Sequence, residues 1–493
     1  MENTQTHEFQ NFQARIAEAE KNIRAVQSSR YALKLHLMPP VGWLNDPNGL
    51  CEKDGLYHIF FQYSPFDAAG GDKFWGHYQT RDFIRYEYTG APLAPDLPID
   101  RDGVYSGCAL VDDGVMKLYY TGNVRDENTD GIMEGREANT VYVETKDGIA
   151  MSPKKCLMTN ADYPSFVTCH VRDPKVWKED GVYYMVQGAW SKDYKGYVLI
   201  FTSENGTDWR YRNFLTTKET FGYMWECPSL FSLNGKQVLS VSPQGVESEE
   251  FRYQNIYQSG YFLFDGDFRG EYSLNNFYEW DMGFDFYAPQ IFEDEKGRQI
   301  LIGWMGIPDA DYTNPTLTDG WQHTLTFPRE LRLSSDGARI LQSPLKELEN
   351  LRKKQVLPTK QSDGKTLYEG LSLYELLVDH ITASLSLTIA DDLHLDWDEA
   401  AGIFTLSFTG SAGYGRTTRK AKLDKLDNLQ VFVDSSAIEV YLNKGELVFS
   451  SRFYPKSPCH DLWLQDGGFA ISGGCSQTLW ELSPITTTYD NKK

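Results

Sequence analysis

Long apolar runs are missing from this sequence of 493 residues. No stretch reaches the roughly 18 apolar residues that span a bilayer, and residues 1–15 lack the basic start and apolar stretch of a signal peptide. We therefore expect no membrane association and a cytoplasmic location. The seven cysteines are irregularly spaced without a Cys-x-x-Cys pair, and the histidines are not clustered. Reduced thiols, no metal site and no cofactor are expected.

Basic residues are also scarce, with 48 against 69 acidic residues and a net charge of -21. Such a surface repels nucleic acid phosphates and anionic membranes at long range, so neither is expected as a partner. The net charge does not exclude an anionic small molecule held in a local basic pocket.

Glycine, proline and aromatic residues are abundant, which is typical of many short strands joined by turns and predicts an all-β protein. A turn followed by an apolar strand recurs five times, with its glycine at positions 55, 114, 181, 235 and 297. Asp-Gly and Asn-Gly between apolar runs favour hairpins because the turn requires positive φ. The spacing suits one four-stranded sheet per repeat and predicts a five-bladed β-propeller. A sandwich with coincidental spacing is the competing interpretation.

The segments on either side of the repeats differ from them. Residues 9–26 place apolar side chains three and four apart, which predicts an amphipathic helix that packs on the protein body or, alternatively, on a second subunit in a homodimer. Residues 343–354 predict a short connecting helix capped by Ser343. Alternating strands after Pro358 predict an antiparallel β-sandwich. The expected organisation is an N-terminal helical extension (1–33), a propeller (34–340), a helical linker (341–358) and a sandwich (359–493).

Polar residues occupy equivalent positions before the repeated turns. Asp46, Ser106, Asp173 and Glu226 precede their turn glycine by nine, eight, eight and nine residues, and the fifth repeat offers Tyr287 and Ala288. Because the innermost strands of a propeller face its axis, these side chains are expected to converge. Individually, Asp46 could be a turn former and Asp173 could form a structural ion pair with Arg172, whereas a Glu inside an apolar stretch needs a partner or a function. Three carboxyl groups that share a funnel predict acid–base chemistry such as glycoside hydrolysis.

At these positions the sequence resembles glycoside hydrolase family 32. The resemblance rests on WLNDPNG (43–49), VRDPKV (171–176) and MWECPSLF (224–231), with further likeness in WGH (75–77), DFYAPQ (285–290), FPREL (327–331) and VDSSAIEVYLNKGE (433–446). YSGCA (105–109) departs from the family pattern because Cys108 replaces a frequent Ser. The resemblance implies a five-bladed propeller with a C-terminal sandwich, and an exo-acting hydrolysis of β-fructofuranosides with retention of configuration.

The resemblance also implies roles for individual residues. Asp46 would be the nucleophile and Glu226 the acid/base, on carboxyl groups about 5 to 5.5 Å apart, while Arg172 and Asp173 would hold the fructose hydroxyls. Further substrate contacts are expected from Trp43, Asn45, Gln62, Tyr105 and Ser106, with Trp75 and Trp304 as apolar walls.

The substrate is less closely defined by the sequence. Residues 1–33 and the run LHLMPPVGWLNDPNG (35–49) are similar to bacterial sucrose-6-phosphate hydrolases, so sucrose 6-phosphate or sucrose is expected. No Gly-rich phosphate loop is present, and the sequence does not distinguish Arg101, Arg125 and Arg136 as phosphate ligands. The alternatives are a fructo-oligosaccharide β-fructosidase, an inverting arabinan-type hydrolase and a non-catalytic fructan-binding propeller.

Overall fold

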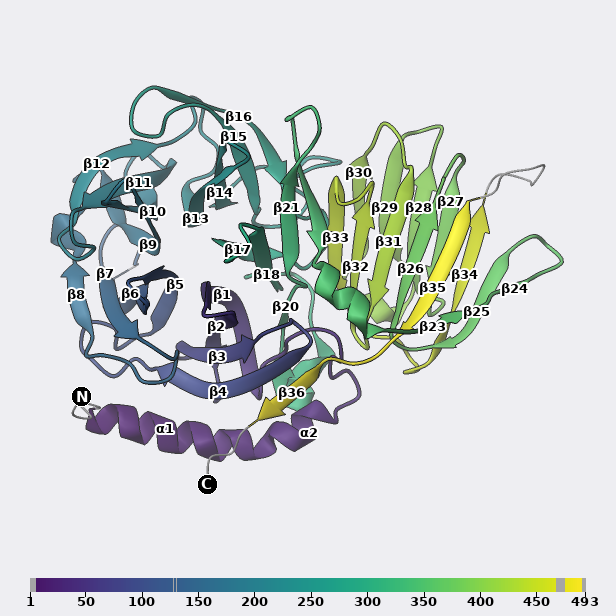
Figure 1. The fold of residues 1–493 in the computed structure, drawn as a ribbon, viewed down its shortest axis with the longest axis horizontal. Coiled ribbons are helices and arrows are strands. Elements are labelled where there is room, and N and C mark those ends of the chain that lie inside the picture. The colour runs from purple at the N-terminus through teal and green to yellow at the C-terminus, as the bar shows by residue number, and fades with distance from the viewer. Residues whose placement is uncertain (1–5, 127, 130, 467–474, 490–493) are drawn as a thin grey trace.

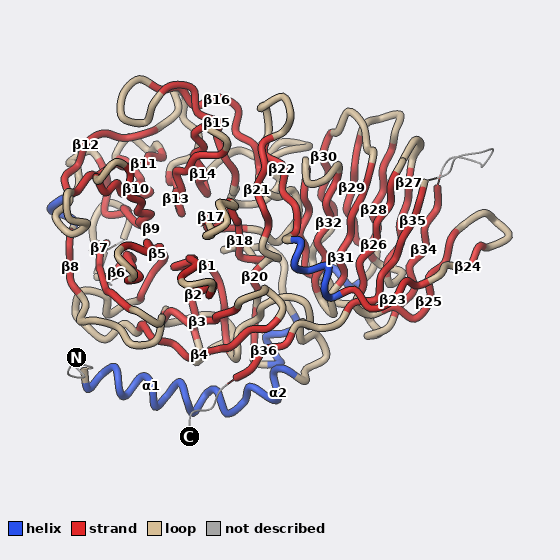
Figure 2. Tube along the Cα trace, viewed as in Figure 1, coloured by secondary structure: helices blue, strands red, loops and turns tan. Residues whose placement is uncertain are grey.

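The computed structural model describes residues 6–126, 128–129, 131–466 and 475–489. Strands make up most of this part of the chain, and Figure 2 shows them in two bodies with helices along one side. Sheets of the first body surround a centre, and the second body lies beside them (Figure 1). The predicted all-β fold with an N-terminal helix is confirmed. None of the described helices is long and apolar enough to cross a membrane.

The first body consists of consecutive antiparallel units of four strands. These are β1 (Gly42–Lys53), β2 (Leu56–Ser64), β3 (Phe74–Thr80) and β4 (Arg85–Leu93); β5 (Val104–Asp112), β6 (Val115–Arg125), β7 (Arg136–Thr145) and β8 (Lys155–Met158); β9 (Val167–Glu179), β10 (Val182–Ser191), β11 (Gly196–Ser203) and β12 (Arg210–Leu215); β13 (Met224–Leu233), β14 (Lys236–Gln244), β15 (Gly260–Gly266) and β16 (Tyr272–Glu279); and β17 (Tyr287–Glu293), β18 (Gln299–Met305), β21 (Arg329–Leu333) and β22 (Ile340–Pro344). Short strands β19 (Trp321–Gln322) and β20 (Thr324–Leu325) pair with β1 and β18.

The first two strands of each of the first four units are joined by the predicted tight turn. Both residues of Asp54-Gly55 have positive φ, at 54° and 67°, and the same holds for the Asp-Gly pairs at 113 and 180 and the Asn-Gly pair at 234. In the last unit only Gly297 of the Lys-Gly pair has positive φ. A two-residue turn with two positive φ values matches the twist of the flanking strands, so the repeated dipeptide fixes each hairpin.

The second body contains two packed antiparallel sheets, as predicted for a sandwich. One contains β23 (Arg352–Val356), β35 (Ser476–Leu482), β26 (Tyr374–Asp379), β31 (Asn428–Val433), β32 (Ala437–Leu442) and β33 (Leu447–Arg452). The other contains β24 (Thr359–Lys360), β25 (Thr366–Leu371), β34 (His460–Asp466), β27 (Leu385–Ile389), β28 (Leu393–Asp398), β29 (Ile403–Phe408) and β30 (Thr418–Lys422). Leu376, Leu387, Leu395, Val431 and Val440 belong to the apolar core that the two sheets enclose.

The predicted connecting helix is wrong in its start and type. Ser343 and Pro344 belong to β22, where they pair with Glu330 and Arg329 of β21. A 3-10 helix, η4 (Lys346–Leu351), follows, and β23 begins directly after it at Arg352. The strand ladder therefore occupies the positions that the sequence pattern assigned to the helix N-terminus.

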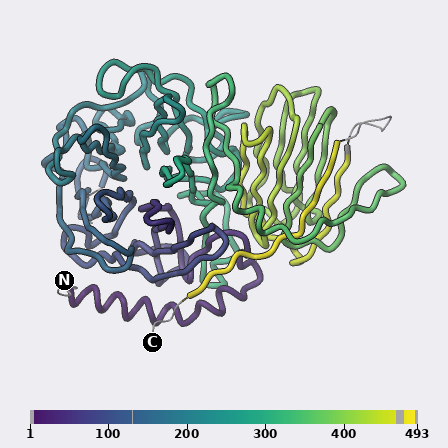
Figure 3. Tube along the Cα trace, in the orientation of Figure 1, coloured from purple at the N-terminus to yellow at the C-terminus, as the bar shows by residue number. Residues whose placement is uncertain are grey.

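The N-terminal helix packs along the first unit. It comprises α1 (His7–Ala19), the 3-10 helix η1 (Glu20–Asn22) and α2 (Ile23–Gln27). Phe12 and Ile16 are buried in the core of that unit, and the ring of Phe12 lies 5.1 Å from that of Phe74. The prediction that the apolar stripe packs on the body is confirmed. The C-terminal strand β36 (Thr486–Tyr489) returns from the sandwich to pair in parallel with β4, beside the helix (Figure 3).

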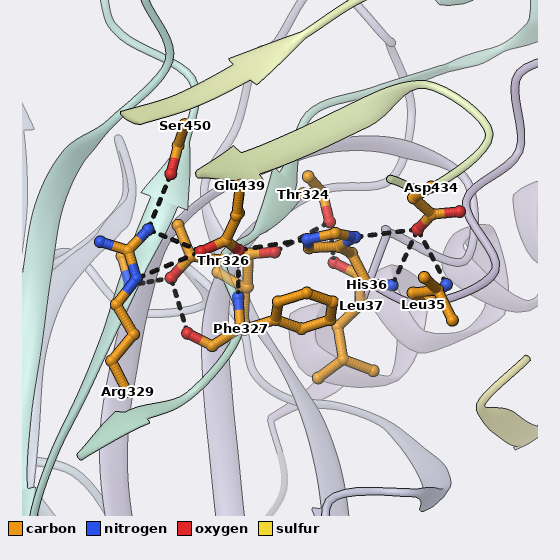
Figure 4. Close-up of polar contacts among 12 residues, drawn as sticks. Leu35, His36, Leu37, Thr324, Thr326, Phe327, Arg329, Asp434, Glu439 and Ser450 are labelled. Carbon is orange, nitrogen blue, oxygen red and sulfur yellow. Dashed lines mark hydrogen bonds and ion pairs between the residues drawn. The ribbon is translucent and has the colours of Figure 1, made fainter. Parts of the chain in front are cut away.

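A buried polar network joins the two bodies (Figure 4). Arg329 donates to Glu439 through NH2 at 2.7 Å and to Asp281 at 3.1 Å. His36, which precedes β1, contacts Glu439 through Nε2 at 3.1 Å and Asp434 through Nδ1 at 2.8 Å. These side chains have no exposed surface. The hairpin of β31 and β32 in the sandwich is thereby bonded to the segment that precedes β1, the strand that carries Asp46.

Candidate active site

Each of the five first strands is interrupted at the position of its predicted site residue. The register shifts after Leu44 in β1, after Val104 in β5, after Glu226 in β13 and after Tyr287 in β17, and it shifts between Arg172 and Lys175 in β9. Such bulges re-aim side chains out of the regular alternation. The regular offset noted in the sequence therefore corresponds to a repeated backbone irregularity.

Proline marks four of these bulges. Asp46, Asp173, Cys227 and Ala288 each precede a Pro, and the last three have positive φ of 63°, 47° and 47°. Because Pro cannot donate to a strand ladder, a Pro inside an inner strand is itself a signal of a bulge. A Pro directly after Asp46, Asp173, Cys227 or Ala288 thus predicts the bulge at that residue.

Asp46 lies at the end of a chain of hydrogen-bonded side chains. Trp43 Nε1 donates to Asn45 Oδ1 at 2.8 Å, and Asn45 Nδ2 donates to Asp46 Oδ1 at 2.9 Å and to the Gln62 side chain. Gln62 Nε2 donates to Ser106 Oγ at 2.9 Å, and that hydroxyl donates to Asp46 Oδ2. These contacts fix both oxygens of Asp46, and the structure brings all five sequence-predicted residues together.

Asp173 is nearly buried, with 4% of its surface exposed. Its Oδ2 accepts a hydrogen bond of 2.9 Å from the backbone N–H of Cys227. Cys227 Sγ lies 3.6 Å from this oxygen and 3.8 Å from Asp46 Oδ2, so the two aspartates flank one thiol. The backbone N–H of Asp173 donates to Thr121 Oγ1 at 2.9 Å, which holds the bulge against the neighbouring sheet.

Glu226 accepts hydrogen bonds from three side chains. Arg172 donates to Oε1 from Nε at 2.9 Å and from NH2 at 2.7 Å. Gln244 Nε2 and Tyr287 OH donate to Oε2 at 2.7 and 2.5 Å. The alternative interpretation of Asp173 as the ion-pair partner of Arg172 is not supported, because the guanidinium bonds to Glu226 instead. His170 Nδ1 contacts Arg172 NH1 at 2.9 Å and orients it further.

The electrostatics of the site are dominated by burial of like charges. Burial raises the pKa of Asp173 to about 7, and the negative charge of Glu226 adds to this while Arg172 opposes it. Burial also raises the pKa of Asp46, against the hydrogen bonds from Ser106 and Asn45. Nearby, burial lowers the pKa of Lys73 to about 8, although the charge of Asp46 opposes this shift. The pKa values of both aspartates are thus raised, and perturbed pKa values of this kind cluster at functional sites.

Two of the predicted aromatic residues are half-buried and two are buried. Trp43 is half-buried, with Lys73 Nζ 5.0 Å from its ring centre and Trp304 at 5.9 Å. Trp304 is only 3% exposed, and Trp75 has no exposed surface. Trp75 Nε1 instead donates to the carbonyl oxygen of Tyr105 at 3.0 Å. Trp75 therefore supports the strand of Tyr105 from behind and does not form the expected apolar wall; Tyr105 itself is half-buried at the edge of the site.

Several residues at the site were missed by the sequence analysis. Gln244 and Tyr287 bond to Glu226, Thr121 bonds to the bulge of Asp173, and Cys227 lies between two aspartates. The offset of Tyr287 in the repeat gave it a position but no role, and Gln244 lies on a second strand that carries no repeated motif. Among the described residues no group of three or more His, Cys, Asp or Glu side chains is arranged to hold a metal ion.

Comparisons with known families cover nearly the whole chain. A profile described as the N-terminal domain of glycosyl hydrolases family 32 matches residues 36–344, and the C-terminal profile of the same family matches residues 347–481. The chain is 40% identical over 457 residues to the sucrose-6-phosphate hydrolase of Bacillus subtilis, covering 90% of this chain and 93% of that protein. It is 36% identical over 465 residues to the raffinose invertase of Escherichia coli, covering 91% and 94%.

Solved structures give the same picture. The sucrose-6-phosphate hydrolase of Lactobacillus gasseri superposes with a TM-score of 0.83 at 28% identity, covering 95% of this chain and 97% of that one. A variant of a Bombyx mori GH32 β-fructofuranosidase in complex with sucrose also gives a TM-score of 0.83 at 28% identity, covering 97% and 99%.

Proposed function

The chain belongs to glycoside hydrolase family 32, and from this membership we propose that it is a retaining β-fructofuranosidase that hydrolyses sucrose 6-phosphate and sucrose to release fructose. Support for the reaction comes from the names of the relatives, among them sucrose-6-phosphate hydrolases and a β-fructofuranosidase crystallised with sucrose. The observation that carries the mechanism is the meeting of Asp46, Asp173 and Glu226 around Cys227 and Arg172.

In the proposed first step Asp46 attacks the anomeric carbon of the fructosyl unit. Its oxygens are oriented by Ser106 and Asn45, so the attacking group is fixed before the substrate arrives. Glu226 delivers a proton to the leaving oxygen, and the bond to the fructosyl carbon breaks as the bond to Asp46 forms. Arg172, Gln244 and Tyr287 fix the orientation of Glu226 for this transfer.

In the proposed second step Glu226 removes a proton from water. The water attacks the fructosyl–Asp46 ester, and fructose leaves with its original configuration after two inversions. Asp173 would accept hydrogen bonds from fructose hydroxyls. Asn45, Gln62 and Ser106 would line the same deep part of the site, and Trp43 and Tyr105 its half-buried edge.

We propose a domain organisation that agrees with membership of this family. Five four-stranded units, each with a bulged first strand, support a five-bladed propeller over residues 34–340. We place the extension at 1–33, the linker at 341–358 and the sandwich at 359–493. A cytoplasmic location fits a substrate that carries a phosphate, since such a sugar does not cross membranes unaided. The buried stripe of α1 gives no support to a homodimer through this helix.

A comparison of kcat/KM for sucrose, sucrose 6-phosphate and a short inulin-type oligosaccharide tests the proposal. Turnover of either sucrose form supports it, and a preference for the oligosaccharide would favour a fructo-oligosaccharide β-fructosidase. Absence of turnover on every β-fructoside, with binding retained, would favour a non-catalytic fructan-binding protein. Inverted product would favour the arabinan-type mechanism and remove the nucleophile role from Asp46.

A further inference from the structure

Two arginines face each other at the edge of the site, and their guanidinium groups have no acidic partner among the described residues. Arg125 at the end of β6 and Arg136 at the start of β7 are directly opposite in the antiparallel ladder. Like charges at such a position destabilise a sheet unless something offsets them. Among the described residues no carboxylate forms an ion pair with either guanidinium, in a chain whose net charge is -21. This local excess of positive charge calls for an explanation.

The two side chains are nevertheless held in place. Arg125 NH2 donates to Tyr105 OH at 2.5 Å, and the guanidinium of Arg136 lies 6.0 Å from the centre of the same ring. Arg136 Nε is buried and has no hydrogen-bond partner. A buried donor without a partner costs free energy of about 1–3 kcal/mol, more when it is charged. Both guanidinium groups therefore lie at Tyr105, and the buried N–H of Arg136 Nε still lacks an acceptor.

The position of Tyr105 relates this pair to the proposed reaction. Tyr105 directly precedes Ser106, whose hydroxyl donates to Asp46. On the other side the positive charge of Arg172, which holds Glu226, lies close enough to lower the pKa of Arg136, although burial is the larger cause. The arginine pair thus contacts the residue next to Ser106, which holds the proposed nucleophile, and Arg136 lies within electrostatic range of Arg172, which holds the proposed acid/base.

Arg101 is distinguished from this pair by its partner. Its Nε lies 3.3 Å from Asp102 Oδ2, and its side chain is 57% exposed. Lys73, which is also affected by the charge of Arg125, has the negative charges of Asp46 and Asp72 nearby. Of the basic residues around the site, Arg125 and Arg136 are therefore the two whose charge is least compensated by described neighbours.

We propose that Arg125 and Arg136 bind the 6-phosphate of the leaving glucose unit and thereby make sucrose 6-phosphate the preferred substrate. The forked guanidinium matches two phosphate oxygens at once, and two such groups offset the dianion. Phosphate binding would also remove the repulsion within the pair and satisfy Arg136 Nε. This inference rests on the proposed hydrolysis of sucrose 6-phosphate and adds the residues that select it.

The test compares two substrates within each variant. Arg125→Gln, Arg136→Gln and the double variant are assayed for kcat/KM on sucrose 6-phosphate and on sucrose. Because a hydrogen bond to a charged group contributes about 1.5–3 kcal/mol, the ratio of the two kcat/KM values should fall roughly tenfold or more in each single variant. We expect a fall of about 100-fold in the double variant, mainly through KM for the phosphorylated substrate. Arg85→Gln is the matched control and should keep the wild-type ratio, because Arg85 lies at the start of β4 and its guanidinium pairs with Asp82.

Product binding gives a second measurement that does not depend on turnover. Glucose 6-phosphate should inhibit the wild-type protein competitively and inhibit the double variant at least tenfold less well, whereas inhibition by glucose should change far less. A double variant with the wild-type substrate ratio and wild-type inhibition by glucose 6-phosphate would overturn the inference. If the double variant does not fold, the single variants Arg125→Gln and Arg136→Gln decide, and a wild-type substrate ratio with wild-type inhibition by glucose 6-phosphate in both would count against the pair.

Failure of this inference and failure of the proposed function have different signatures. A wild-type protein that hydrolyses neither sucrose nor sucrose 6-phosphate contradicts the proposed function. A wild-type protein that hydrolyses both with equal kcat/KM, and whose ratio the arginine variants leave unaltered, contradicts only the phosphate assignment.

Discussion

The guanidinium of Arg172 holds Glu226 and leaves its own sequence neighbour, Asp173, without a hydrogen bond from it. Two nitrogen atoms of Arg172 reach Glu226 Oε1, at 2.9 and 2.7 Å. Asp173 is turned away by positive φ at the bulge and accepts instead from the backbone of Cys227. The bulge therefore separates two adjacent charged side chains and gives each a different partner.

This separation has a chemical consequence for the site. Burial raises the pKa of Asp173 to about 7, although the charge of Arg172 opposes this shift. Arg172 orients Glu226, while Asp173 relies on a backbone N–H and a thiol. Three carboxyl groups can thus share a small space because their partners differ.

The catalytic roles predict large losses from near-isosteric changes. Asp46→Asn replaces the nucleophilic carboxylate with a neutral amide, and Glu226→Gln removes the proton donor, so we expect kcat for sucrose to fall by roughly 10²–10⁴-fold in each variant. Glu52→Gln, on the same strand as Asp46 but at its other end, is the control and should stay within about twofold of wild type. Full turnover by the Asp46→Asn, Glu226→Gln double variant would show that other groups perform the reaction.

Retention of configuration can be read from a stable product. In the presence of methanol, a fructosyl–Asp46 intermediate should be intercepted to give methyl β-fructofuranoside, which does not mutarotate. NMR of the trapped glycoside then reports the configuration directly. The α-anomer as the sole trapped product would exclude a double displacement at Asp46.

The pKa of Asp173 predicts a pH dependence of stability. Its pKa is raised to about 7 in the folded protein, so between about pH 4 and 7 the folded state retains a proton that the unfolded state has lost. Stability should therefore fall as pH rises through this window, with the full penalty above pH 7. In Asp173→Asn the ionisation is absent, and the Tm difference between variant and wild type should shift in favour of the variant by about 1–3 °C from pH 5 to pH 8.

The comparison must be made as a difference between two pH values. Any loss of packing in Asp173→Asn affects both measurements equally and cancels. Asp208→Asn, an exposed position on the loop before β12, serves as the control and should show the same Tm shift as wild type. A Tm difference for Asp173→Asn that is constant across the range would mean that Asp173 does not titrate within it.

Much of the site could be predicted because local signals repeat. The Asp-Gly and Asn-Gly turns fixed the hairpins, and the constant offset to those turns brought Asp46, Asp173 and Glu226 into one register. Each of these signals lies within about ten residues of the position it determines. The repeated offset from a local turn was therefore enough to predict that residues far apart in the sequence lie close together.

What escaped prediction depends on contacts between distant segments. Tyr287 is 61 residues from Glu226, and its offset in the fifth repeat predicted its position but not its hydrogen bond to Glu226. Trp75 resembled an apolar wall by its residue type, but packing against Phe60 and Tyr120 buries it. Ser343 and Pro344 were expected to begin a helix. They belong to strand β22 instead, because they pair with residues of β21. In these cases tertiary pairing overrode the local pattern.

The N-terminal helix predicts a stability effect that separates packing from assembly. Ile16 is 2% exposed within the core of the first sheet, so Ile16→Ala should destabilise the protein by about 2–4 kcal/mol and lower Tm. Glu18→Ala, on the exposed face of the same helix, should change stability by less than about 0.5 kcal/mol. Light scattering at several concentrations should give the same mass for both variants. A loss of dimer specific to Ile16→Ala would instead place this stripe at a subunit interface.

The network between the two bodies predicts the largest stability loss outside the site. Arg329→Met leaves Glu439 and Asp281 buried without their shared cation, and breaking such a pair costs about 3–5 kcal/mol. Glu439→Gln on its own should also destabilise, because Arg329, His36 and the backbone N–H of Phe327 lose an anionic acceptor. The double variant Arg329→Met, Glu439→Gln should be less unstable than the sum of the two, measured as a double-mutant cycle in denaturant.

The same network gives stability an upper and a lower pH limit. Burial opposes ionisation of Glu439, but Arg329 and His36 outweigh it and lower its pKa to about 2, so this contribution is lost as pH falls from about 4.5 toward 2. Burial likewise disfavours the charged form of His36, but Asp434 and Glu439 raise its pKa, so its contribution is complete below pH 6.5 and is lost as pH rises through the raised pKa. His36→Gln should remove the alkaline loss and keep the acid loss, as followed by Tm from pH 3 to 9. Arg332→Met, an exposed arginine on the same strand as Arg329, should leave both limits where they are. If the Tm of His36→Gln falls at alkaline pH as that of the wild type does, the imidazole does not carry the charge that binds Glu439 to Asp434.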